Sequence, residues 1–67
     1  MFYKILGKKE NKAFCYPVDN VQESINNGYS FRDLKDNTFH FCAKDEIVEN
    51  PIFTGKKCLG YQEIVLA

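Results

Sequence analysis

The stretch that decides the expected fold of this chain is Asp19-Asn20-Val21-Gln22-Glu23-Ser24-Ile25-Asn26-Asn27-Gly28. Asn20 can cap the N-terminus of a helix, and Glu23, three residues later, completes a capping box. Val21 and Ile25 are four residues apart, which places them on one face of a helix. Gly28 can adopt the left-handed conformation in which helices often end. The stretch therefore predicts a two-turn helix that must dock on a sheet, because a helix this short is not stable alone.

The segments before this stretch are typical of two β-strands. Residues 2–6 are short, aromatic and β-branched, and residues 12–18 alternate between apolar and polar positions. Residues 7–11 are polar and begin with a glycine, so we expect a hairpin with a five-residue loop. Pro17 has no backbone N–H to donate, so it marks a sheet edge or the end of a strand.

The segments after the stretch also favour strands. Residues 38–43 alternate cleanly, and residues 47–49 are short and apolar. Near the C-terminus, residues 64–66 are three consecutive apolar residues, so both faces of the last strand must be covered. A central place in the sheet would cover them, and so would an edge strand that pairs with a second copy of the chain.

Together these elements predict one α+β domain over residues 1–67, in the order β-β-α-β-β-β. We expect a small curled antiparallel sheet of four to five short strands with one short helix packed on it. A half-open barrel is the alternative. A chain of 67 residues has room for one domain only.

The charge of the chain excludes some functions. Nine basic and nine acidic residues give a net charge of zero, whereas DNA-backbone binders usually have a basic excess. The charges are segregated, with a net +3 over residues 1–12 and a net −4 over residues 19–49. Such a distribution can orient a partner but exerts no long-range attraction on polyanions. We therefore expect nucleic acid to be an unlikely partner.

The cysteines and the apolar runs indicate a compartment. Cys15, Cys42 and Cys58 are an odd number and cannot all pair within one chain. The first residues lack the basic start and apolar core of a signal peptide, and no apolar run approaches the length of a membrane span. We therefore expect a cytoplasmic protein with free thiols and no membrane association.

A metal centre or an enzyme is not expected. The best candidate ligand set is the three cysteines with His40, which matches the composition of a structural zinc site. Against it, the ligands are scattered singly and no Cys-x-x-Cys pair is present; whether they converge in space is left open. His40 is the only histidine, with no orienting acid at a recognisable spacing. We predict no cofactor and no catalytic residues.

The candidate binding residues are aromatic and basic. Tyr29 and Arg32 lie beside the expected helix end, and Tyr and Arg are the residue types that most often anchor interfaces. Arg32 can also bind a phosphate through two hydrogen bonds, with tyrosines as stacking planes. We add Tyr61 as a further stacking residue, and Lys8 and Lys9 from the basic first hairpin.

These features lead to three hypotheses about function. The chain looks like the compact accessory proteins of bacteriophages and mobile elements of AT-rich bacteria, since it is very short and rich in Asn, Lys and Ile. We first expect a non-enzymatic protein that blocks a host enzyme or defence system, as a homodimer or higher oligomer. The alternative is a protein that sequesters a nucleotide signal at a subunit interface. A second alternative is a single-stranded nucleic-acid-binding module that uses the first hairpin.

Overall fold

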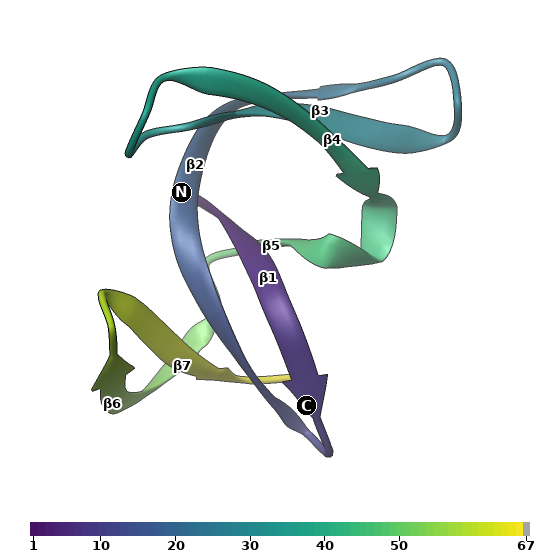
Figure 1. Ribbon diagram of the computed structural model, residues 1–67. Coiled ribbons are helices and arrows are strands. Elements are labelled where there is room, and N and C mark those ends of the chain that lie inside the picture. Colours follow the sequence, from purple (N-terminus) through teal and green to yellow (C-terminus); the bar gives the residue numbers. More distant parts are fainter. Residues whose placement is uncertain (67) are drawn as a thin grey trace.

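The computed structural model describes residues 1–66 as seven antiparallel strands and one short 3-10 turn (Figure 1). In chain order these elements are β1 (Phe2–Lys9), β2 (Lys12–Glu23), β3 (Gly28–Asp33), β4 (Thr38–Ala43), η1 (Lys44–Glu46), β5 (Ile47–Glu49), β6 (Ile52–Cys58) and β7 (Tyr61–Val65). The α+β prediction is therefore wrong. The fold is nearly all β, it has seven strands where four to five were expected, and η1 is its only helical element within the described residues.

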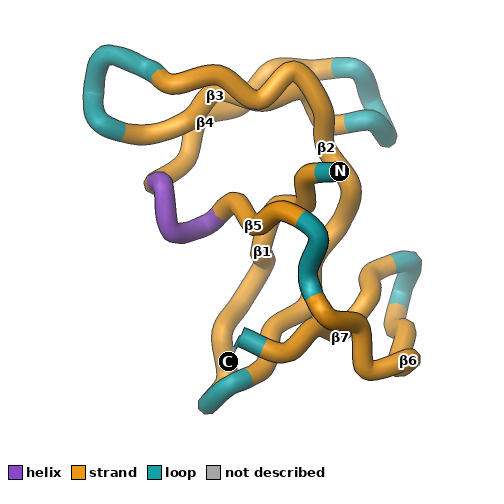
Figure 2. The backbone as a smooth tube through the Cα atoms, turned by 180° about the vertical axis from the view of Figure 1, so that it is seen from behind, coloured by secondary structure: helices purple, strands orange, loops and turns teal. Residues whose placement is uncertain are grey.

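The long strand β2 organises the sheet. One edge of β2 pairs with β1, which in turn pairs with β5. Its other edge is shared, because β7 pairs with the first residues of β2 and β3 pairs with the last ones. Figures 1 and 2 show β2 as a curved strand that runs from the β6–β7 hairpin at one end of the molecule to the β3–β4 hairpin at the other. The sheet is therefore strongly curled, with β4, β5 and β6 on its outside edges.

The stretch expected to form a helix is instead the end of β2 and the loop that follows it. β2 continues to Glu23, and Asn20 adopts a positive φ of 51° at a bulge in the pairing with β3. Asn tolerates this conformation, so a residue type that can cap a helix through its side chain also suits a bulge. Ile25, expected to pack on the sheet, is fully exposed in the loop. Pairing with β3 supplies backbone partners that an isolated two-turn helix lacks.

The first hairpin is also tighter than expected. β1 extends to Lys9, which pairs with Lys12, so the loop contains two residues where five were predicted. Glu10 takes a positive φ of 58° in this turn. A bulge between Ile5 and Gly7 absorbs one residue of β1. The strands predicted at residues 38–43 and 47–49 are confirmed as β4 and β5 with the same bounds.

The curl of β2 gives the chain two small buried regions. Ile5, Ala13, Cys15 and Ile64 form one cluster, and each has 3% or less of its surface exposed. Val18 lies three positions after Cys15 in a regularly paired strand, so its side chain points to the opposite face. The buried Val18 and Phe31 accordingly lie outside the first cluster, as expected for a sheet that covers both faces by bending.

The apolar C-terminal segment is covered within the chain itself. β7 lies between β2 and β6, and Ile64 is completely buried. The place of β7 between two strands thus covers its apolar residues within one chain. Residues 64–66 therefore do not require pairing with a second copy of the chain. Within residues 1–66, no helix is long and apolar enough to cross a membrane.

Candidate functional site

The most exposed aromatic surface lies on the edge strand β4. Phe39 has 62% and Phe41 76% of its surface exposed. In the pairing of β3 with β4, the buried Phe31 is opposite His40, so the two phenylalanines next to His40 point to the other, outer face. The outer face of β4 therefore presents two aromatic side chains at alternate positions.

The free edge of β4 lacks the usual protection. Among the described strands β4 pairs with β3 alone, so its second edge has no strand partner. Natural edge strands are commonly blunted by lysine, proline or charged side chains, and residues Thr38–Ala43 contain none of these. An edge with exposed aromatic residues and without such protection is suited to pairing with another strand.

Arg32 lies beside this surface but is already bound to an acidic partner. It is opposite Phe39 in the pairing of β3 with β4. Its Nε donates to Asp19 Oδ1 at 2.7 Å and its second nitrogen donates to Oδ2, so the pair is bidentate. This hydrogen bonding holds the pKa of Asp19 below its ordinary value. A phosphate would have to displace Asp19, which disfavours the predicted phosphate-binding role of Arg32.

The other predicted binding residues do not gather in one place. Tyr29 is on β3, with Lys44 Nζ 5.8 Å from the centre of its ring. Lys8 pairs with Asp45 at 3.4 Å, and Lys9 lies at the end of the first hairpin. The ammonium group of Lys8 thus pairs with the acidic middle of the chain.

Tyr61 lines an apolar groove of about 410 Å³. Its ring meets that of Tyr16 edge-to-face, with centroids 5.9 Å apart. Burial and the nearby Asp33 carboxylate raise the pKa of Tyr16, so its hydroxyl stays neutral. The apolar part of the lining also includes Leu6, Pro17, Leu34 and Leu59, and the charged residues Asp33 and Lys35 line the groove as well. Volume and aromatic lining fall within the range of small-molecule sites.

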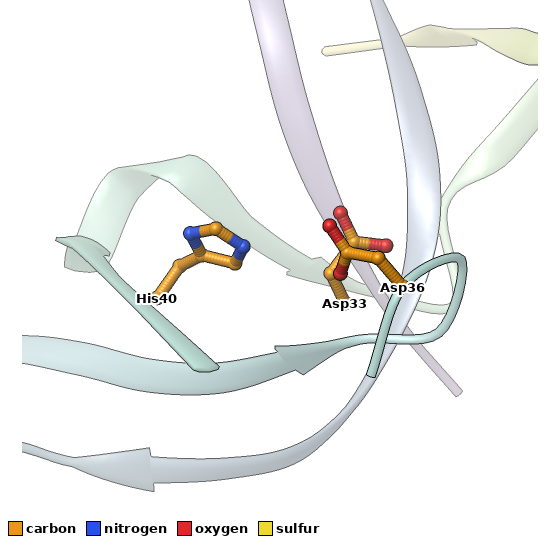
Figure 3. Close-up of side chains that lie close together, drawn as sticks. All are labelled: Asp33, Asp36 and His40. Atoms are coloured by element: carbon orange, nitrogen blue, oxygen red, sulfur yellow. The ribbon is translucent and has the colours of Figure 1, made fainter. Parts of the chain in front are cut away.

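The three cysteines and His40 do not form a ligand set. Cys15 is buried, Cys42 half-buried and Cys58 exposed, and all three are free. Burial raises the pKa of both Cys15 and Cys42, which keeps them as thiols. Within residues 1–66, the only group of three metal-ligating side chains that converges is a different one, Asp33, Asp36 and His40 (Figure 3).

Sequence reasoning missed the surfaces that matter most here. Phe39 and Phe41 were assigned to a strand but not to an interface, although a Phe-His-Phe alternation without lysine or proline is itself a signal of an unprotected edge. Asp33 and Asp36 were not among the candidate metal ligands, which were the three cysteines and His40. The absence of catalysis stays a prediction, since Thr38 and His40 do make a hydroxyl–imidazole contact of 2.7 Å.

Comparison with known proteins identifies no relative: no protein family, no curated protein and no solved structure matches this chain.

Proposed function

We propose that this chain is a small non-enzymatic module that binds another protein by pairing a strand to the free edge of β4. The observation that carries the proposal is the pair of exposed aromatic residues, Phe39 and Phe41, on a strand that has one unpaired edge. An added strand would satisfy the free backbone groups of β4, and its alternate side chains would cover the two rings.

The fitting partner segment is extended and apolar at alternate positions. Two rings on one face of β4 are one pleat repeat apart, so residues i and i+2 of the partner strand lie against them. Arg32 and Asp19 neutralise each other beside Phe39, so the surface offers no strong charge to select the partner. Partner recognition by this surface therefore rests on backbone pairing and aromatic packing.

A second copy of the chain meets this description. The sequence of β4 reads Phe-His-Phe around His40. Antiparallel pairing of two β4 strands centred on His40 would place Phe39 of each copy opposite Phe41 of the other. Cross-strand aromatic pairs contribute roughly 0.2–1 kcal/mol each relative to alanine pairs. We therefore propose that the free protein forms a homodimer through β4, which a partner strand must displace.

Self-association provides the first test of the surface. Sedimentation equilibrium should show a dimer for the wild-type chain and a monomer for Phe41→Asp. The matched control is Ile52→Asp, which changes a side chain that is 71% exposed on β6, close to the 76% of Phe41. A dimer that survives Phe41→Asp, or one that Ile52→Asp abolishes equally, would count against pairing at β4.

Partner binding needs a second measurement. In affinity capture, a protein retained by the wild-type chain and by Ile52→Asp should be lost with Phe41→Asp. Amide hydrogen exchange of the purified complex should then slow in β4 and leave the β6–β7 hairpin unchanged. Slowed exchange on β6, or retention by Phe41→Asp, would refute the assignment of the surface. Our first hypothesis goes one step further and proposes that binding inhibits the captured protein.

Small-ligand binding is the second candidate function, and the groove beside Tyr61 favours it. A planar ligand such as a nucleotide base could stack against Tyr16 or Tyr61. A thermal shift with nucleotides that is lost in Tyr61→Ala would support this function, whereas a shift that persists in that variant would exclude the groove.

The free state of all three cysteines supports a reducing, cytoplasmic location for either function.

A further inference from the structure

Three potential metal ligands converge at the end of the β3–β4 hairpin. Asp33 is the last residue of β3, Asp36 lies in the turn, and His40 is on β4. One ligand atom from each lies within 4.8 Å of those of the other two. Figure 3 shows the two carboxylates side by side and the imidazole ring across from them. Asp33 is half-buried, and the other two residues are exposed to solvent.

The hairpin itself holds these side chains together. The N–H of Asn37 donates to the carbonyl oxygen of Asp33 at 2.8 Å, which closes the turn. Asp33 is opposite Thr38 in the strand pairing, so Asp33 and His40 share one face of the hairpin. Asp36 is turned back toward them because Thr38 donates to its Oδ1 from both the backbone N–H, at 3.1 Å, and the hydroxyl, at 2.6 Å.

The imidazole is also positioned by its neighbours. The ring of His40 lies over the buried Phe31, with centroids 5.7 Å apart and planes tilted by 31°. Its Nε2 is 2.7 Å from the Thr38 hydroxyl oxygen, the same atom that contacts Asp36. A nitrogen and a carboxylate oxygen are thus held on either side of one hydroxyl group.

No lysine or arginine side chain balances the charge of the two carboxylates within residues 1–66. None of these described side chains forms an ion pair with Asp33 or Asp36, although four ion pairs form elsewhere on the described surface. Two neighbouring carboxylates repel each other, and the repulsion is relieved when a cation binds between them.

We propose that Asp33, Asp36 and His40 bind a divalent transition-metal ion of the zinc type. Three protein ligands of mixed oxygen and imidazole character suit Zn²⁺ or Co²⁺, with water completing the coordination. Calcium fits poorly, because it prefers six to eight oxygen ligands, and magnesium loses its own water reluctantly. The Thr38 hydroxyl, which contacts two of the three ligands, orients them for the ion. This site does not depend on the proposed pairing at β4.

The test is a Zn²⁺ titration followed by calorimetry, on tag-free protein carrying Cys58→Ser. That substitution removes an exposed thiol that could itself bind zinc, and the remaining two cysteines are buried or half-buried. We expect one Zn²⁺ per chain. Asp36→Asn and His40→Gln should each weaken binding about tenfold or more, which is at least the loss measured when a supporting residue is removed from a metal site. Asp45→Asn, an exposed carboxylate outside the cluster, is the matched control and should leave binding unchanged.

A second measurement locates the ion independently of mutation. Paramagnetic Co²⁺ should shift the amide resonances of residues 33–40 most strongly, and a large excess of Ca²⁺ should not displace it. Amide spectra of the two ligand variants establish that they remain folded. The proposal is overturned if Zn²⁺ does not bind saturably, if Asp45→Asn weakens binding as much as Asp36→Asn, or if the Co²⁺ shifts centre elsewhere.

Discussion

Gly28 allows a direct test of the all-β fold, because the strand and the helix interpretations assign it different roles. In the structure it is the first residue of β3, it is buried, and it pairs with Ala43. Its φ is not in the left-handed region, where the helix interpretation would place it. It is a glycine because the chain passes close by: a Cβ at this position would lie 2.3 Å from the carbonyl oxygen of Cys42.

The size of the effect of Gly28→Ala follows from that distance. Carbon and oxygen atoms in close contact across a sheet are usually about 3.3–3.6 Å apart, so the strands must separate by roughly 1 Å. The obstructing atom belongs to the backbone of β4 and cannot rotate away as a side-chain end would. Overpacking of this kind costs about 1–3 kcal/mol. For a domain of this size, each kcal/mol lowers the melting temperature by roughly 4–8 °C.

Thermal and urea unfolding followed by circular dichroism measure this loss. Gly7→Ala is the matched control, since a Cβ on Gly7 meets no atom within 4 Å and its φ is also outside the left-handed region. We expect the control to unfold close to the wild type or slightly above it, because alanine restricts the unfolded chain. Gly28→Asn separates the two interpretations further, since asparagine is well tolerated in a left-handed helix end but carries the same obstructing Cβ.

Unfolding of Gly28→Ala together with Gly7→Ala would contradict the close approach of Gly28 to Cys42. A Gly28→Asn variant clearly more stable than Gly28→Ala would contradict it equally, because that ranking indicates a left-handed residue at the end of a helix.

Two further predictions concern single side chains. Iodoacetamide should modify the exposed Cys58 first and the completely buried Cys15 only as the chain opens, since burial also raises the pKa of Cys15. Mass spectrometry of timed samples measures the order of modification, and equal rates at the two cysteines would contradict the burial of Cys15. The hydrogen bond from Lys4 holds the pKa of Glu46 below its ordinary value of about 4.3. The contribution of this bond to the free energy of unfolding is therefore fully present above that pH, and it is lost as the pH falls through the lower pKa of the folded state. Urea unfolding should therefore show Glu46→Gln to be less stable than the wild type at pH 7, with the gap closing toward pH 3; a gap that is independent of pH would refute the assignment.

Sequence reasoning predicted the bounds of two strands correctly. β4 and β5 have the expected bounds, since residues 38–43 alternate between the two faces and turn-forming residues limit both segments. The helix at Asp19–Gly28 was predicted from local signals that a bulged strand also satisfies. Asn20 suits a bulge, and Asn27, with a φ of 59°, suits a loop as well as a helix end. Only the pairing partner, β3, decides between them, and a local pattern does not contain that information.

The binding residues were harder to predict because their roles depend on what lies opposite. Arg32 was expected to be available to a partner, but Asp19, thirteen residues earlier, is brought beside it by the pairing of β2 with β3. Tyr61 does line a groove, yet Tyr16, its aromatic neighbour, comes from a strand 45 residues away in the chain. Contacts between distant segments thus assign roles that residue type alone leaves open.

The division of the chain into two small buried regions explains why so much apolar surface remains outside. β2 contributes completely buried side chains to both faces, those of Cys15 and Val18. The others are Phe31 on β3 and Ile64 on β7. Phe39 and Phe41 lie two strands away from β2, on the face that no second layer covers. Because these rings contribute little to the buried regions, their replacement should affect association far more than folding. That separation makes Phe41→Asp a test of binding that is not confounded by loss of the fold.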